Sequence, residues 1–96
     1  MGAQEFTQTA KGKQPSDAFT EAREQALYDH GRSGYTGSIA EKMDFKVLTL
    51  PADTTPADFI ETCFNNETHF CNDKWGAAAC IKTGKDEYTF FGLASS

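Results

Sequence analysis

At the start of the chain, polar residues surround one large apolar side chain: Phe6 lies among threonines and glutamines over residues 4–10. This composition favours a short edge strand over a helix. Residues 11–15, which include a glycine and a proline, then break the pattern. We therefore expect the first element to be a strand that ends before residue 15.

The next segment has apolar residues at helical spacing, which predicts a helix. These apolar positions are Ala18, Phe19, Ala22, Ala26 and Leu27. Ser16 or Asp17 is expected to cap the helix by accepting hydrogen bonds from its free N–H groups. The helix should end near Asp29 or His30, with Gly31 as the terminating cap.

Residues 44–50 are nearly continuously apolar and contain a β-branched side chain. This pattern is typical of a strand that is buried on both faces or lies at the centre of a sheet. We interpret it as the central strand, which Pro51 ends.

A second, short helix is expected over residues 56–64. Thr54 or Thr55 supplies a capping hydroxyl, and Pro56 is suited to the first turn. One face of this helix would be buried. That face consists of Phe59, Ile60, Cys63 and Phe64.

Residues 75–83 and 88–94 predict two strands of a terminal antiparallel hairpin, joined by residues 84–87. Residues 76–79 have almost no side-chain bulk, which lets a helix or a partner backbone approach closely. The order β-α-β-α-β-β predicts an α+β fold with a mixed sheet of about four strands and two helices on one face. Trp75, Tyr88 and Phe90 would then form either an aromatic contact patch on the open face or part of the core.

Composition and charge narrow the expected number of domains, the kinds of partner and the compartment. A chain of 96 residues with 39% hydrophobic residues fits a single domain, residues 1–96, with one core. The net charge of −5 argues against direct binding of nucleic acid or anionic lipid. Three cysteines, an odd number, and an N-terminal stretch without an apolar region favour a cytoplasmic protein. No apolar run approaches the length of a membrane-spanning helix.

Acidic residues gather in the segment from residue 53 to residue 73, where Lys and Arg are absent. This segment is either a solvated surface or a surface that competes with nucleic acid for a basic protein. If this segment binds a basic protein, we expect contacts from it and from residues 29–35, at the end of the first helix and in the loop that follows. The candidate partner-binding residues are Asp58, Glu61, Glu67, Asp73, Asp29, Arg32 and Tyr35.

A glycine-rich loop spans residues 30–42, with Gly31, Gly34 and Gly37 at three-residue spacing. Glycines before a helix start can present backbone N–H groups to an anion, and Ser38 with Glu41 has the form of a capping box. The alternative is a structural loop that needs glycine for close packing. A small ligand would be held by His30, Gly34, Gly37 and Ser38. No residue is assigned a catalytic role.

Cys63, His69, Cys71 and Cys80 are suitable ligand types for zinc. However, the spacing lacks the close cysteine pair of structural zinc sites, and core packing is the expectation for Cys63 and Cys80. A Cys71 nucleophile assisted by His69 is the less favoured alternative. We predict no metal and no cofactor.

The stretch of residues 22–42, AREQALYDHGRSGYTGSIAEK, resembles a segment of small, mostly uncharacterised proteins of bacteria and their phages. In size and charge the chain is similar to phage-encoded inhibitors of host defence, including anti-CRISPR proteins. The resemblance implies a non-enzymatic inhibitor in the host cytoplasm whose acidic surface occupies a basic, nucleic-acid-handling host protein. The alternative is a small-ligand or nucleotide-phosphate binding protein, or an enzyme, that uses the loop of residues 30–42.

Overall fold

The computed structural model describes residues 3–30, 39, 42–66, 68–73 and 76–95, with the backbone alone at residues 29, 30 and 95. The expected order β-α-β-α-β-β and the α+β class are confirmed. A short 3-10 helix, η2, interrupts the segment expected to be a loop. The elements are β1 (Ala3–Lys11), α1 (Pro15–His30), β2 (Phe45–Val47), α2 (Pro56–Asn65), η2 (Phe70–Asn72), β3 (Ala78–Gly84) and β4 (Glu87–Ser95).

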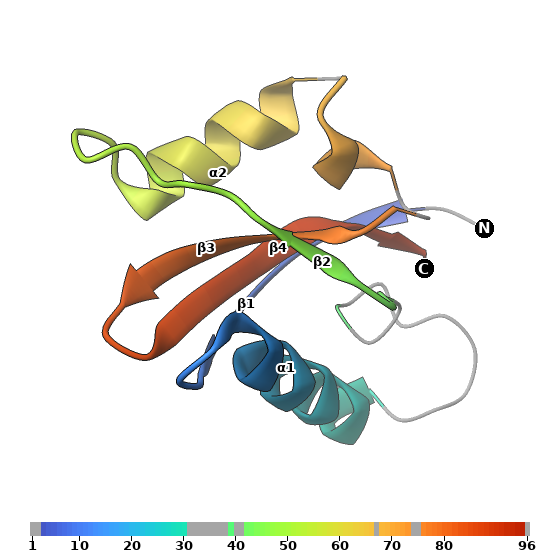
Figure 1. Ribbon diagram of the computed structural model, residues 1–96. Coiled ribbons are helices and arrows are strands. Elements are labelled where there is room, and N and C mark those ends of the chain that lie inside the picture. The colour runs from blue at the N-terminus through green and yellow to red at the C-terminus, as the bar shows by residue number, and fades with distance from the viewer. Residues whose placement is uncertain (1–2, 31–38, 40–41, 67, 74–75, 96) are drawn as a thin grey trace.

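The four strands form one mixed sheet in the order β1-β4-β3-β2. β4 pairs antiparallel with both β1 and β3, and β2 pairs parallel with β3. The terminal hairpin of β3 and β4 therefore occupies the middle of the sheet (Figure 1). β1 lies at one edge, as its composition predicts.

The expectation that residues 44–50 form the central strand is wrong. β2 is three residues long and lies at the edge of the sheet opposite to β1, and Val47 is 55% exposed. Phe45 packs against the apolar cluster on one face of the sheet, whereas Leu48 and Leu50 pack against the cluster on the other face. The continuous apolar pattern thus arises because these residues pack against apolar clusters on both faces of the sheet. It does not arise from a position between two neighbouring strands.

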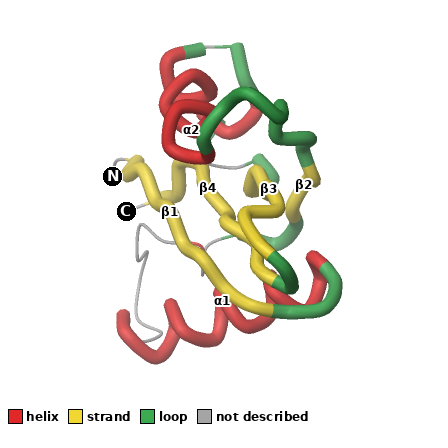
Figure 2. The backbone as a smooth tube through the Cα atoms, turned by 90° about the vertical axis from the view of Figure 1, so that its left-hand side faces the viewer, coloured by secondary structure: helices red, strands yellow, loops and turns green. Residues whose placement is uncertain are grey.

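The two helices lie on opposite faces of the sheet, so the expectation of both on one face is wrong (Figures 1 and 2). Consecutive residues of a strand point to opposite faces, and both Phe90 and Phe91 are fully buried. Phe90 belongs to the cluster under α1, here called the α1-side cluster, and Phe91 to the cluster under α2, the α2-side cluster. The molecule therefore has three layers: helix, sheet and helix.

Each cluster draws residues from several elements. The buried members of the α1-side cluster are Phe6, Ala10, Ala18, Phe19, Ala22, Ala26, Ile39, Ala78, Cys80, Tyr88, Phe90 and Ala94. Those of the α2-side cluster are Cys63, Cys71, Ala79, Ile81 and Phe91, joined by the partly buried Leu48, Leu50, Phe59, Ile60, Phe64 and Phe70. Tyr88 and Phe90 are core residues and not part of an exposed aromatic patch, while Trp75 lies outside the described residues.

The starts of the two helices agree with the sequence expectation to different degrees. α2 begins as expected, because the Thr55 hydroxyl accepts a hydrogen bond from the Asp58 N–H at 3.2 Å and Pro56 opens the first turn. α1 begins earlier than expected, at Pro15, so Ser16 and Asp17 lie inside its first turn and do not cap it. Within the described residues, neither helix is long and apolar enough to cross a membrane.

Among the described residues, Lys42 is the largest fully buried side chain, with 1% of its surface exposed. Its Nζ donates hydrogen bonds to the carbonyl oxygens of Asp73 at 3.2 Å and Gly76 at 2.9 Å. Burial lowers the pKa of the ammonium, while the Asp73 carboxylate acts in the opposite direction. Lys42 therefore ties the residues before β2 to the segment that leads into β3, a role that the sequence does not indicate.

Candidate protein-binding groove

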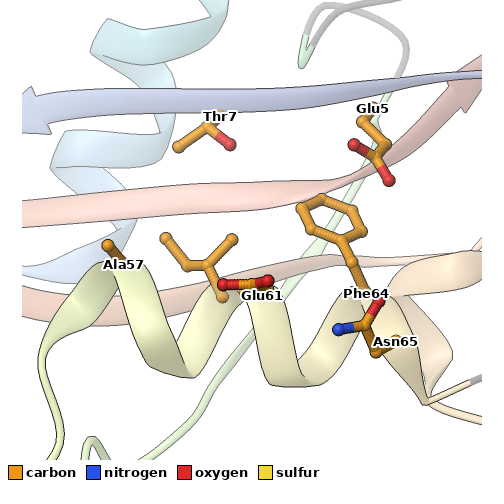
Figure 3. A pocket seen from close by; sticks show the side chains of 7 residues that line it. Glu5, Thr7, Ala57, Glu61, Phe64 and Asn65 are labelled. Carbon is orange, nitrogen blue, oxygen red and sulfur yellow. The ribbon is translucent and has the colours of Figure 1, made fainter.

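A groove lies between β1 and α2, on the face of the sheet that α2 covers (Figure 3). Its volume is about 470 Å³. Of the residues that the structure describes, two from β1 and five from α2 line it. They are Glu5, Thr7, Ala57, Ile60, Glu61, Phe64 and Asn65.

The strand side of the groove follows from the alternation of side chains along β1. Phe6 and Ala10 point into the α1-side cluster, so Glu5 and Thr7 point to the opposite face of the sheet. The α2-side cluster draws its buried strand residues from β3 and β4, namely Ala79, Ile81 and Phe91. Because α2 packs over these two strands, β1 lies beside the helix and forms the second wall of the groove.

The helix side of the groove contains an apolar surface formed by Ala57, Ile60 and Phe64. Phe64 packs edge-on against Phe91, with ring centroids 5.8 Å apart, and this contact fixes the position of its ring. Ile60 and Phe64 are only partly buried by the α2-side cluster. In Figure 3 the Phe64 ring rises from α2 toward the strands, close to the Glu5 side chain. The groove thus offers apolar surface next to a carboxylate.

The charged residues among the seven that line the groove are Glu5 and Glu61, one from each wall. Both are exposed, and none of the described lining residues is a Lys or Arg. Asp58 is also exposed on α2, three residues before Glu61. The groove therefore carries a negative potential that favours a cationic occupant.

The structure places the predicted acidic contacts in different surroundings. Asp58 and Glu61 share α2, and Glu61 lines the groove. Asp73 follows η2, where its carboxylate acts on the ammonium of Lys42, so a structural role accounts for it. Glu67, Arg32 and Tyr35 lie outside the described residues, and Asp29 is described by its backbone alone.

The predicted small-ligand site falls almost entirely outside the described residues. His30 is the last residue of α1, and its side chain is not described. Gly34, Gly37 and Ser38 lie in the segment that the structure does not describe. Ligand binding by this loop stays a prediction.

The cysteines do not converge on one site, because Cys80 is in the α1-side cluster and Cys63 and Cys71 are in the α2-side cluster. His69 Nδ1 accepts a hydrogen bond from the backbone N–H of Cys71 at 3.1 Å and so caps η2. Burial raises the pKa of Cys71 to about 11, which leaves its thiol protonated and a poor nucleophile at neutral pH. The described residues therefore assemble neither the four-ligand zinc site nor the Cys71–His69 pair considered from the sequence.

The Cys80 thiol predicts a pH dependence of stability. Burial raises its pKa from 9.0 to about 12. In the unfolded chain the thiol ionises near pH 9, so its contribution to stability is complete below pH 9 and is lost as the pH rises toward 12. Urea unfolding of the wild type and Cys80→Ala should show a stability difference that shrinks by about 1.4 kcal/mol per pH unit above 9. A constant difference from pH 7 to 11 would contradict this assignment.

The sequence names Glu61 as a candidate contact and predicts the apolar face of the second helix, but it does not indicate that Glu5 and Thr7 line a groove with them. The sequence carries the signal in two separate places: an edge strand with polar side chains on one face, and an apolar helix face ending at Phe64.

Comparison with known proteins found no relative: the chain matches no family model, no curated protein and no solved structure.

Proposed function

We propose that this protein is a non-enzymatic protein-binding module that holds a basic, partly apolar segment of a partner in the groove between β1 and α2. One observation carries the proposal: the lining that the structure describes combines apolar side chains of α2 with two carboxylates, Glu5 and Glu61, and contains no Lys or Arg. A Lys or Arg side chain could place its aliphatic stem on the apolar wall and its charge beside a carboxylate.

The charge of the groove indicates the kind of partner. Protein surfaces that hold phosphate backbones are rich in Lys and Arg, so an acidic groove would compete with nucleic acid for such a surface. In the setting that the sequence resemblance implies, the partner is a nucleic-acid-handling protein of the host, and binding inhibits that protein. Charge complementarity would speed association and suppress wrong partners.

Charge reversal in the groove tests the proposal. The double variant Glu5→Lys, Glu61→Lys should lose at least about tenfold in affinity, about 1.4 kcal/mol, for the basic protein that the wild type retains from a host lysate. Retained proteins would be identified by mass spectrometry, and the affinity of the purified partner measured by calorimetry at low and high salt.

The matched control is Glu21→Lys, Glu24→Lys, which makes the same change in net charge on exposed residues of α1, across the sheet from the groove. This control should retain the partner. Equal loss in both double variants would show that net charge and not the groove determines binding. If neither variant changed what is retained, the proposal would be rejected.

A further inference from the structure

β1 has one edge that no described strand covers. It pairs with β4 along its whole length, and within the described part of the chain β4 is its neighbour in the sheet. The backbone N–H and C=O groups on the other side of β1 therefore lack a strand partner among these residues. An edge of this kind is a template for pairing with another extended chain.

The register identifies which residues present these backbone groups. The N–H of Gly12, the residue after β1, donates to the carbonyl oxygen of Asp86 at 2.9 Å, and the same register continues through β1 from Lys11↔Glu87 to Ala3↔Ser95. Hydrogen-bonded pairs alternate with non-hydrogen-bonded pairs in an antiparallel ladder. Even-numbered residues of β1 thus bond to β4, and odd-numbered residues direct their backbone groups to the free edge.

A second contact agrees with this assignment. The hydroxyl oxygens of Thr9 and Thr89, which face each other across β1 and β4, are 2.8 Å apart. Side chains approach most closely at non-hydrogen-bonded pairs. Thr9 is therefore at such a pair, as are Thr7 and Glu5, two and four residues before it.

The same residues that present free backbone groups also face the groove. Glu5 and Thr7 line it with their side chains, and their N–H and C=O groups point along the sheet to the free edge. A strand paired there would alternate its own side chains between the two faces of the sheet. Every second side chain would then lie on the face where Glu5, Glu61 and Phe64 are found.

We propose that the partner segment binds as an added strand, paired with the free edge of β1 at Glu5, Thr7 and Thr9. This inference rests on the proposed function and specifies how the segment is held. The occupant is an extended segment in which the side chains facing the groove are basic, apolar and basic. The apolar side chain packs toward Phe64, and the flanking cations reach Glu5 and Glu61.

Charge complementarity favours this occupant over a second copy of the chain. The edge presents Glu5 beside Glu61, so pairing two β1 strands would bring carboxylates together on one face, and like charges across a strand pair are destabilising. A basic segment removes this repulsion. The backbone supplies affinity that is independent of sequence, and the groove supplies the selection.

The test uses the full chain and a synthetic peptide, acetyl-Thr-Lys-Thr-Leu-Thr-Lys-Thr-amide, whose Lys, Leu and Lys side chains share one face of a strand. Two N-methylated peptides accompany it, one with methyl groups on the Lys and Leu amides and the other with methyl groups on the inner Thr amides. Since only alternate amides of an added strand face β1, one methylated peptide should bind at least tenfold more weakly than the parent and the other should bind like it. Antiparallel addition predicts that the Lys and Leu amides are the sensitive set.

Hydrogen exchange gives a second measurement: the parent peptide should slow exchange of the Glu5, Thr7 and Thr9 amides. Equal affinity of all three peptides, still weakened by Glu5→Lys, Glu61→Lys, would overturn strand addition and leave the acidic groove in place. If the parent peptide does not bind, strand addition is likewise overturned, and the lysate experiment decides the proposed function separately. Slowed exchange of these amides by self-association without peptide would assign the edge to a second copy.

Discussion

Replacing Phe91 with alanine is expected to lower the free energy of unfolding by about 3–5 kcal/mol, because Phe91 is fully buried at the centre of the α2-side cluster. Its ring receives Phe64 edge-on at 5.8 Å and Phe59 at 6.5 Å between centroids. The substitution leaves a cavity under α2 that these two rings cannot fill without moving the helix. Urea unfolding measures the loss, which is large against the total of about 5–15 kcal/mol for a domain.

The control for this prediction is Phe91→Leu, which keeps most of the volume and should cost less than about 1.5 kcal/mol. Hydrogen exchange in Phe91→Ala should show a greater loss of protection in α2 than in α1, because α1 packs on the other face of the sheet. Equal loss in the two helices would contradict the division of the core into two clusters.

Replacing Lys42 with alanine is expected to lower the free energy of unfolding by about 2–4 kcal/mol, from lost packing of its buried stem and lost hydrogen bonds. The Nζ hydrogen bonds to the carbonyl oxygens of Asp73 and Gly76 connect the start of β2 to the approach to β3. Without the ammonium, these oxygens lose a charged donor. Thermal and urea unfolding would both report the change.

Lys42→Met separates the two contributions, because methionine fills much of the same space but donates no hydrogen bond. It should cost about 1–2 kcal/mol, less than Lys42→Ala. A Lys42→Met variant as stable as the wild type would mean that the buried charge costs as much in desolvation as its hydrogen bonds return.

The elements that sequence predicts correctly are those set by local chemistry. The cap at Thr55 and the proline after it define the start of α2 within a few residues. The hairpin of β3 and β4 follows from two apolar segments with a short turn between them. In both cases neighbouring residues suffice to determine the structure.

The expectations that the structure contradicts concern which elements pack against one another. Phe90 and Phe91 are adjacent apolar residues, and adjacent residues of a strand face opposite sides, so the pair requires cover on two faces. A sheet with one layer of helices cannot provide it. The same reasoning applies to residues 45–50 at the sheet edge: Phe45 of β2 contacts the α1-side cluster, whereas Leu48 and Leu50, which follow β2, contact the α2-side cluster. A hydrophobic pattern along the chain predicts which residues are buried, but it does not predict which elements bury them.

The candidate groove was only partly predictable for a similar reason. Glu61 follows from the acidic segment of the sequence. Glu5 joins it only because β1 pairs with β4 and β4 lies beneath α2, and these are contacts between distant parts of the chain.

The pairing of the first strand with the last one has a consequence for biosynthesis. During translation, residues 3–11 leave the ribosome before residues 87–95 are made, so β1 cannot pair with β4 until then. Contacts of such high sequence separation are slow to form, because a long loop must close first. The groove beside β1 therefore depends on a pairing that only the last part of this sequence completes, and a nascent chain cannot present the assembled groove to a partner before residues 87–95 are made.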